Sequence, residues 1–230
     1  MKSALTLCID VGGTGLKASV LNSKGEMQAE KVRIDTPYPC PPPVLLQALK
    51  TLVRPLPKFD RVSAGFPGYI RGGKVITAPH FGNDAWRDFP LADRLSSLLG
   101  KPARILNDAD MQGLAAIAGK GLELVVTLGT GVGTALFRDG ILMPHIELAQ
   151  HPLRHGKTYN EYLGDQARKK IGKAKWNRRL DKTLAVLETL FQYESLFLGG
   201  GNSSRITLKL KPNQRIVSND DGMIGGVYLW

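Results

Sequence analysis

Two segments of the chain repeat one plan: an apolar strand, a turn rich in glycine and threonine, and a second apolar strand. The first reads LTLCIDVGGTGLKASVL from Leu5, and the second reads LVVTLGTGVGTALF from Leu124. Such a turn can be a tight hairpin and nothing more. Its amides can also surround an anion, and threonine adds a hydroxyl donor. Because the plan occurs twice, we expect two related lobes that each begin with a phosphate-binding hairpin.

The intervening sequence alternates strand and helix patterns. After the first hairpin we expect a third strand over 26–34, a helix over 44–56, short strands over 61–70 and 73–79, a helix over 90–100, a strand over 103–106 and a helix over 108–119. After the second hairpin we expect two basic helical stretches within 158–190, a strand over 195–200 and a final segment over 222–230.

Composition limits the class of protein. A chain of 230 residues, 43% of them hydrophobic, can bury the core of one large domain or of two lobes. The apolar run before Asp10 is shorter than a signal-peptide core, and no later run reaches membrane-spanning length, so we expect a cytoplasmic protein with no membrane partner. Cys8 and Cys40 have neither the spacing of a metal site nor the number of a disulfide scaffold, so we expect reduced thiols and no zinc.

The net charge of +11 favours anionic partners such as nucleotides, phosphorylated metabolites, polyphosphate or nucleic acid. Nucleic acid is disfavoured, because the most basic segment has few aromatic residues and no recognition motif. A solvated helix face would explain that segment equally well. Its ten cations are Arg154, Lys157, Arg168, Lys169, Lys170, Lys173, Lys175, Arg178, Arg179 and Lys182.

Five ordered motifs, DVGGTGLKASV, AGFPG, NDAD, TLGTGVGTALF and LGGGNSS, resemble the sugar-kinase branch of the actin-like ATPase superfamily. Within it they resemble the repressor, open reading frame, kinase (ROK) family, and the short length and GTGVGTALF look most like its polyphosphate glucokinases. The resemblance implies an α/β fold of two actin-like (ribonuclease H-like) lobes, each a mixed sheet flanked by helices. The lobes would span 1–106 and 107–221, with 222–230 returning to the first.

The resemblance also implies a reaction: transfer of a phosphoryl group from ATP or polyphosphate to a hexose hydroxyl, with Mg²⁺ present. Asp108 would be the general base that accepts the hydroxyl proton. Taken alone, Asp108 reads as a helix N-cap, and Asp110 would then be a surface acid. Asn107 and the backbone around Gly65, Pro67 and Gly68 would orient the sugar.

The phosphate-side residues follow from the same resemblance. Asp10 would hold magnesium through water, and Lys17 would contact phosphate or be a solvated strand residue. The last glycine turn would lie at a helix start, where the dipole favours anions, although a plain strand-to-helix turn fits it equally. The three turns comprise Gly12, Gly13 and Thr14; Gly129, Thr130, Gly131 and Gly133; and Gly199, Gly200 and Gly201.

One motif departs from the family. Where ROK sugar kinases carry Glu-x-Gly-His, this chain has Glu147-Leu148-Ala149-Gln150, with a histidine one position late. Glu147 keeps the sugar-binding role, and Gln150 can still donate and accept hydrogen bonds, so we expect an altered sugar preference. The alternative is a sugar- or phosphate-binding relative that has lost turnover.

The family's cysteine-rich zinc motif is also absent. Since the chain begins at the first phosphate motif, we expect none of the DNA-binding helices of the repressor members. The sugar, the donor and a homodimer are left open.

Overall fold

The computed structural model describes residues 4–218 and 221–230. The chain divides into two compact units, one running to Ala115 and including Gly222–Trp230, the other running from Ala116 to Asp221. The division lies at the end of helix α4 (Asp108–Ala116) rather than after residue 106 as expected from the sequence. The reason is packing, because Met111 of α4 lies against Gly65 and against the main chain of Gly225, both in the first unit.

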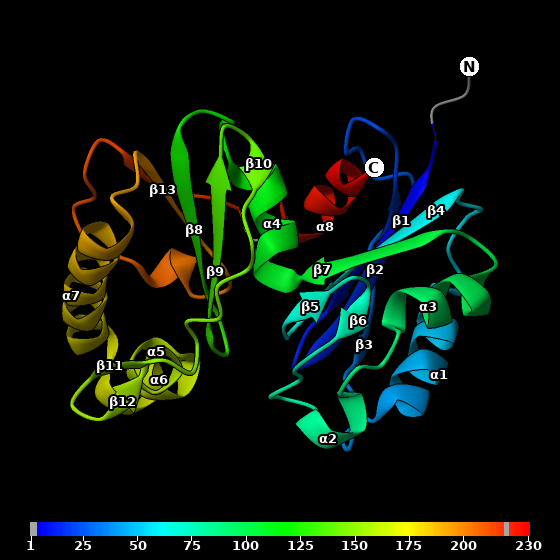
Figure 1. The fold of residues 1–230 in the computed structure, drawn as a ribbon, viewed down its shortest axis with the longest axis horizontal. Helices are drawn as coiled ribbons and strands as arrows, with labels where there is room; N and C mark the ends of the chain where they lie inside the picture. The colour runs from blue at the N-terminus through cyan, green and yellow to red at the C-terminus, as the bar shows by residue number, and fades with distance from the viewer. Residues whose placement is uncertain (1–3, 219–220) are drawn as a thin grey trace. The chain divides into compact units, whose positions relative to one another are not determined.

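The first unit contains a five-stranded mixed sheet in the order β3-β2-β1-β4-β7 (Figure 1). β2 is antiparallel to β1 and β3, whereas β1, β4 and β7 run parallel. The strands are β1 (Thr6–Val11), β2 (Gly15–Leu21), β3 (Val32–Asp35), β4 (Arg61–Phe66) and β7 (Ala103–Asn107).

β3 is shorter than the strand predicted over 26–34. The side-chain oxygen of Asn22 accepts hydrogen bonds from the amides of Lys24 and Glu26, which ties the chain into a turn. Beyond it, pairing with β2 is limited to one isolated bridge between Leu21 and Met27 until β3 begins. The Asn22 side chain thus competes with strand β2 for the main-chain amides that follow it, which the apolar pattern of the sequence did not reveal.

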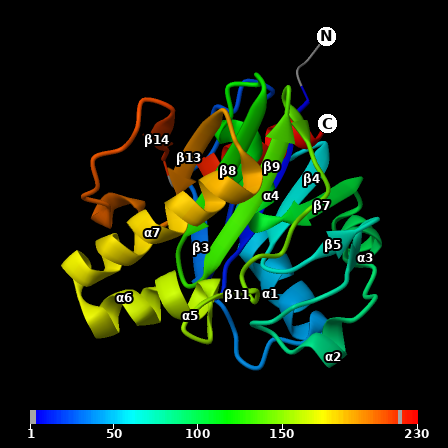
Figure 2. The ribbon, with the colours of Figure 1, turned by 60° about the vertical axis from the view of Figure 1, so that its left-hand side comes forward.

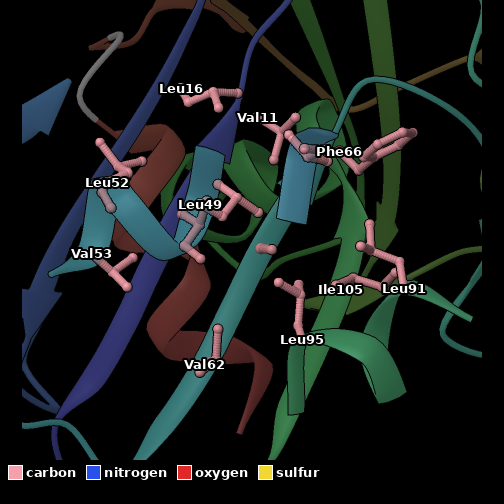
Figure 3. Close-up of a cluster of buried hydrophobic side chains, with 14 of the residues drawn as sticks. Val11, Leu16, Leu49, Leu52, Val53, Val62, Phe66, Leu91, Leu95 and Ile105 are labelled. Atoms are coloured by element: carbon pink, nitrogen blue, oxygen red, sulfur yellow. The ribbon is translucent and has the colours of Figure 1, made fainter. Parts of the chain in front are cut away.

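Alternation along the central strand directs its residues to two faces of the sheet. Leu7, Ile9 and Val11 are fully buried on the face covered by α1 (Pro42–Val53) and α3 (Leu91–Leu99), in the core drawn in Figure 3. Each fully buried leucine or valine there stabilises the fold by about 1.5 to 3 kcal/mol. The remaining elements of this unit are β5 (Ile70–Arg71), β6 (Lys74–Val75) and α2 (Asn83–Trp86).

The opposite face of this sheet is covered by the C-terminal segment. Cys8 and Leu21 pack there against Met223 and Val227. Met223 lies in α8 (Asp221–Ile224), and Val227 lies in the 3₁₀ segment η2 (Gly225–Leu229). Both faces of the first sheet are therefore covered from within its own unit.

The second unit repeats the topology of the first. Its sheet has the order β10-β9-β8-β13-β14, with β9 antiparallel to β8 and β10, and with β8, β13 and β14 parallel. The two sequence segments that share a plan are β1-β2 and β8-β9, in equivalent places of the two sheets, which confirms the predicted pair of related lobes. The strands are β8 (Leu122–Leu128), β9 (Val132–Arg138), β10 (Ile141–Leu142), β13 (Ser195–Gly199) and β14 (Gln214–Ile216).

Two basic helices, α6 (Asp165–Ile171) and α7 (Lys173–Phe191), carry most of the basic segment, as predicted (Figure 2). A short helix without Lys or Arg, α5 (Tyr159–Leu163), precedes them. Thr158 and Glu161 form a capping box at the start of α5, and Gly172 separates α6 from α7. The buried face of α7 packs on the sheet through Trp176, Leu180, Leu184 and Leu187. A hairpin of β11 (Pro152–Arg154) and β12 (Lys157–Thr158) precedes these helices, and the 3₁₀ turn η1 (Ser203–Arg205) follows β13.

Within residues 4–218 and 221–230, no helix combines the length and the apolar character needed to cross a membrane.

Candidate active site

The carboxyl ends of β1, β4 and β7 gather the predicted residues of the first unit. Asp10 on β1 is in register with Gly65 on β4, and the neighbouring Phe66 is in register with Asn107 on β7. Since the three strands are parallel, their ends lie along one edge of the sheet, where open α/β sheets bind ligands. Asp10, Gly65 and Asn107 thus reach a common edge from three separate stretches of sequence.

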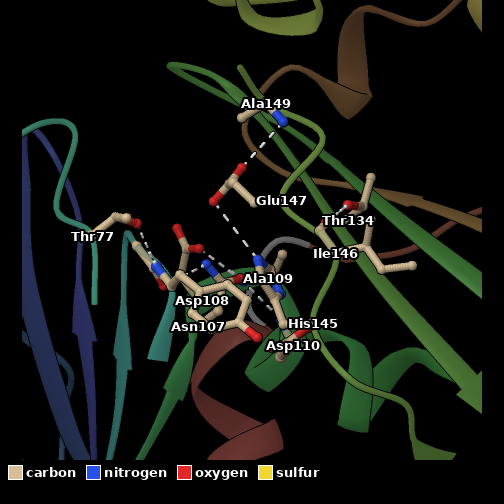
Figure 4. Close-up of polar contacts among 12 residues, drawn as sticks. Thr77, Asn107, Asp108, Ala109, Asp110, Thr134, His145, Ile146, Glu147 and Ala149 are labelled. Carbon is tan, nitrogen blue, oxygen red and sulfur yellow. Dashed lines mark hydrogen bonds and ion pairs between the residues drawn. The ribbon is translucent and has the colours of Figure 1, made fainter. Parts of the chain in front are cut away.

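Asn107 connects that edge to α4 (Figure 4). Its side-chain oxygen accepts hydrogen bonds from the amides of Ala109 at 2.8 Å and Asp110 at 3.3 Å, so Asn107 is the N-cap of α4. The cap expected at Asp108 is therefore one residue earlier. The side-chain nitrogen of Asn107 donates to the carbonyl oxygen of Gly68 at 3.1 Å.

Asp108 is the first residue of α4 and is half-buried. Its Oδ1 accepts a hydrogen bond from the amide of Ala109 at 2.9 Å. A Cβ on Gly65 would lie 3.3 Å from the Cα of Asp108. The absence of a side chain at Gly65 therefore lets the main chain of Asp108 pack closely against β4. Asp110, predicted as a surface acid, is 3% exposed, because its position on α4 faces the packed interior.

The loop after β4 is tied down from two sides. Gly68 accepts the hydrogen bond from Asn107, and the amide of Tyr69 donates to Oγ1 of Thr77 at 3.1 Å. Pro67 and Gly68 are buried. The backbone that was predicted to orient a sugar is therefore held rigidly beside Asn107.

The first glycine turn closes tightly between β1 and β2. The amide of Gly12 donates to the carbonyl of Gly15 at 3.1 Å, and a Cβ on Gly12 would lie 2.7 Å from that same oxygen. Position 12 therefore requires glycine. Thr14, at the tip, is exposed.

Three side chains outside the motif bind the outward carbonyls of this turn. Oγ1 of Thr36 donates to the carbonyl of Gly12 and the hydroxyl of Tyr38 to that of Gly13, both at 2.6 Å. Nη2 of Arg33 donates to the carbonyl of Thr14 at 3.3 Å. Sequence reasoning missed these three residues, because none belongs to the glycine motif.

Asp10 and Lys17 are cross-strand partners and form an ion pair, with 3.0 Å between Nζ and Oδ2. Both side chains are partly buried, so Lys17 is engaged with Asp10 rather than fully solvated. Magnesium is commonly bound by one or two carboxylates together with substrate phosphates. Asp10 is such a carboxylate, and it fits an ion that arrives with the phosphoryl donor. Over the described ranges 4–218 and 221–230, no cluster of three or more His, Cys, Asp or Glu could hold a metal by itself.

The second glycine turn joins β8 to β9 at Gly129, Thr130 and Gly131. Gly133, expected in this loop, instead lies within β9 in register with Thr127. Gly199 of β13 is the partner of Thr127 on the other side. Thr127 therefore has a residue without a side chain on each neighbouring strand.

The turn after β13 packs directly on the second glycine turn. Gly200 has φ of 83°, and a Cβ there would lie 2.5 Å from main-chain atoms of Leu128, so only glycine fits. The main-chain N–H of Asn202 donates to the carbonyl of Leu128 at 2.8 Å, and its side-chain Nδ2 donates to the carbonyl of Gly129 at 3.2 Å. The helix expected after Gly201 is instead the single 3₁₀ turn η1. A turn of three residues has no helix dipole of the kind expected to attract an anion to these glycines.

Two residues of the basic segment also brace the second glycine turn. The amide of Asp165 donates to the carbonyls of Gly129 at 3.0 Å and Thr130 at 3.3 Å. Oδ1 of Asn160 accepts from the amide of Val132 at 2.7 Å. These contacts involve main-chain atoms about thirty residues away in sequence, a separation at which no local pattern operates.

The carboxylate of Asp165 is also bound by cations. Lys169 lies 2.7 Å from Oδ2, and Arg168 donates to Oδ1 from Nε at 2.9 Å and from Nη2 at 2.7 Å. The Lys169 hydrogen bond, followed by that of Arg168, holds the pKa of Asp165 below its ordinary value of 3.8 against the effect of burial. Part of the basic segment therefore stabilises the start of α6.

Glu147 lies in the segment after β10. Its Oε1 accepts from the amide of Ala149 at 3.1 Å, and Oε2 lies 3.7 Å from Nε2 of His145 (Figure 4). Thr134 anchors the same segment by donating to the carbonyl of Ile146 at 2.8 Å. Gln150 is exposed in the turn that follows. The histidine beside Glu147 is therefore His145, which precedes the glutamate and which the motif comparison missed.

Comparison with known proteins agrees with this arrangement. The model of the ROK family matches residues 6–144. Polyphosphate glucokinase of Mycobacterium tuberculosis is 30% identical over 214 residues, which cover 89% of this chain and 80% of that protein.

Two solved structures extend the comparison to the fold. Inorganic polyphosphate/ATP-glucomannokinase from Arthrobacter sp. strain KM has a TM-score of 0.88 at 30% identity, with 98% of each chain covered. A ROK family glucokinase from Streptomyces griseus, solved with glucose and AMPPNP, has a TM-score of 0.80 at 19% identity, with 98% of each chain covered, and supports the fold alone. The chain therefore belongs to the ROK family, in the sugar-kinase branch of the actin-like ATPase superfamily.

Proposed function

We propose that the protein transfers a phosphoryl group from ATP or polyphosphate to a hydroxyl of a hexose, with Asp108 as the general base. The observation that carries the proposal is the position of Asp108. It begins α4 beside the Asn107 cap, at the sheet edge that also holds Asp10 and the Gly12–Thr14 turn.

In the reaction, the sugar oxygen attacks the terminal phosphorus of the donor. A new P–O bond forms, the P–O bond to the rest of the donor breaks, and the leaving oxygen keeps the electron pair. The Asp108 carboxylate accepts the proton of the attacking hydroxyl. Little else is required of a side chain, because phosphoryl transfer depends mostly on positioning and charge neutralisation.

The glycine turns supply the phosphate-side donors. Amides of Gly13 and Thr14 in one unit, and of Thr130 and Gly131 in the other, suit phosphate oxygens. The glycines at 199–201 continue the second set, since Asn202 ties that turn to Gly129. Magnesium, held by Asp10 through water, would neutralise donor charge when bound.

The groups proposed to bind the sugar are Asn107 and the backbone from Gly65 to Gly68 in the first unit, and Glu147 and Gln150 in the second. One hydrogen of the Asn107 amide goes to Gly68 O, and the second can donate to a sugar hydroxyl. The names of the two relatives at 30% identity support glucose or a closely related hexose as acceptor. They support polyphosphate, alone or beside ATP, as donor.

The test is a screen of hexoses against ATP and polyphosphate with magnesium present, in which the sugar phosphate is detected directly. Asp108→Asn should abolish turnover while sugar-induced melting shifts remain, because the amide keeps the shape and loses the proton acceptor. Asp93→Asn is the matched control, since Asp93 is an exposed acid in the first turn of α3. An Asp108→Asn variant that retains most of the parent rate would remove Asp108 from the mechanism.

A second candidate is a binding protein without turnover, which the replacement of the motif histidine by exposed Gln150 favours. Sugar-induced melting shifts without product from any donor would select this candidate over the kinase.

A further inference from the structure

Three consecutive carbonyl groups of the first glycine turn are each bound by a side chain from one short segment. Thr36, Tyr38 and Arg33 bind the carbonyls of Gly12, Gly13 and Thr14 respectively. A peptide unit is planar and trans, so its N–H points away from its C=O. Fixing the carbonyls of Gly12 and Gly13 therefore fixes the direction in which the amides of Gly13 and Thr14 point.

The turn needs such restraint because of its own composition. Glycine populates both signs of φ about equally, so a Gly-Gly-Thr turn can rotate its peptide units at little cost. Inside the turn, the one main-chain bond runs from the Gly12 amide to the Gly15 carbonyl, and it leaves the two middle peptides to other partners.

Tyr38 makes its contact from an exposed position. Its side chain is 59% exposed, and its ring centroid lies 6.1 Å from that of Phe81, which packs on Phe66 and Trp86. Burial of the hydroxyl, and to a lesser extent Cys40, raises the pKa of Tyr38, so the phenol keeps its proton and is the donor to Gly13. A residue this exposed contributes little to the core, so its hydroxyl can be tested without unfolding the unit.

Thr36 makes the corresponding contact from inside, at 8% exposure. Arg33 has a weaker share, because its guanidinium also pairs with Asp35 at 2.8 Å and its bond to Thr14 is the longest of the three. Tyr38 and Thr36 therefore carry the restraint.

We infer that Tyr38 and Thr36 are positioning residues for the phosphoryl donor: they hold the Gly12–Thr14 turn with its amides directed at the donor's phosphate oxygens. The inference rests on the proposed phosphate-binding role of that turn. Neither residue need touch the substrate, and their effect is on donor binding rather than on the sugar.

The variants are Tyr38→Phe, which removes one hydroxyl, and Thr36→Val, with Thr36→Ser to restore the donor if valine impairs folding. Tyr228→Phe is the matched control, because Tyr228 is 54% exposed in the same unit and lies in the C-terminal segment. For Tyr38→Phe we expect roughly a two- to tenfold rise in KM for the donor, the effect of one lost hydrogen bond. The KM for sugar and the melting temperature should match the parent. Thr36→Ser should restore donor KM relative to Thr36→Val.

Binding of tripolyphosphate, measured by calorimetry without sugar, separates this inference from the proposed function. If the parent binds tripolyphosphate but turns over no sugar, the kinase proposal is wrong, and weaker binding by Tyr38→Phe still supports the positioning role. If parent and Tyr38→Phe have the same donor KM and the same tripolyphosphate affinity, the positioning role is wrong and the kinase proposal stands. The positioning role is also wrong if the parent binds no tripolyphosphate, or if Tyr38→Phe lowers the melting temperature together with the affinity.

Discussion

The side-chain nitrogen of Asn107 donates a hydrogen bond to the carbonyl oxygen of Gly68 at 3.1 Å, while its side-chain oxygen caps α4. One side chain therefore connects the loop after β4 to the start of the helix that carries Asp108. This connection places the proposed base and the proposed sugar-binding backbone in a fixed relation within the first unit.

The two functions of Asn107 can be separated by substitution. Asn107→Ser keeps an oxygen for the cap and loses the donor to Gly68, whereas Asn107→Ala loses both. We expect alanine to lower the free energy of unfolding by about 1 kcal/mol more than serine does, the usual value of an N-cap. Both should raise the KM for sugar. Equal chemical denaturation midpoints for the two variants would contradict the assignment of the cap.

Gln150 stands where the family motif has histidine, on an exposed turn after Glu147. If the pocket accepts glucose weakly, Gln150→His should raise kcat/KM for glucose roughly severalfold, because one recovered hydrogen bond contributes about 0.5 to 1.5 kcal/mol. Gln47→His, on the exposed face of α1, is the control. No change, or a loss, would mean that this turn serves another ligand.

The exposed lysines of α6 and α7 bear on the choice of donor. Lys169, Lys170 and Lys173 are exposed on the segment whose Asp165 amide contacts the second glycine turn. Changing all three to Gln should weaken polyphosphate binding and reduce its salt dependence, while ATP-dependent turnover changes little, because a long polyanion binds mainly through counterion release.

The measurement is a titration of each donor at about 50 and about 200 mM salt, a range over which polyanion binding changes strongly. Lys50, Lys58 and Lys101, exposed in the first unit, give a control triple variant of equal charge change. If the triple variant loses affinity equally for both donors, or if polyphosphate supports no turnover at either salt concentration, the basic segment is a solvated helix face and not a polyphosphate-binding site.

Asp165 predicts an acid-dependent loss of stability. Lys169 and Arg168 lower the pKa of Asp165 in the folded state. Its ion pairs therefore stabilise the fold fully at pH values above the ordinary pKa of 3.8, and this stabilisation is lost as the pH falls through the folded-state pKa. Asp165→Asn should reduce stability by about 0.2 to 1 kcal/mol near neutral pH, the range for partly exposed pairs. The difference from the parent should vanish in acid. A difference that persists unchanged down to acid unfolding would show that the ion pairs are not its source.

The C-terminal segment should protect Cys8. Burial raises the pKa of its thiol to about 12, so the native protein should resist alkylation at neutral pH. Nε1 of Trp230 donates to Oγ of Ser63 at 2.9 Å, and the Trp230 ring lies 4.2 Å from the Arg104 guanidinium. Trp230→Ala should loosen this segment and expose Cys8 to a thiol reagent.

Mass spectrometry of the labelled protein would locate the modification. Cys40, which is 1% exposed and belongs to the core on the other face of the sheet, is the internal control and should stay unlabelled. Equal labelling of both cysteines in Trp230→Ala would indicate general unfolding instead.

The sequence by itself determined the two hairpins, the order of the longer strands and helices, and the family. These depend on local signals: the apolar runs of β1 and β8, and glycines at positions such as Gly12 where a side chain would collide with the turn. The repeated plan also predicted the repeated lobes, because equal strand–turn–strand patterns lead to equal places in the two sheets.

Only the tertiary structure decided which residues share the site. Strand register brings Asp10, Gly65 and Asn107 to one edge, and a shift of one residue would have reversed every side chain. The cap at Asn107 instead of Asp108, and the contacts of the Tyr38 and Asn160 side chains with the glycine turns, are hydrogen bonds to main-chain atoms. Every residue except proline carries the same main-chain N–H and C=O groups, so the sequence has no signal for which of them a distant side chain will bind.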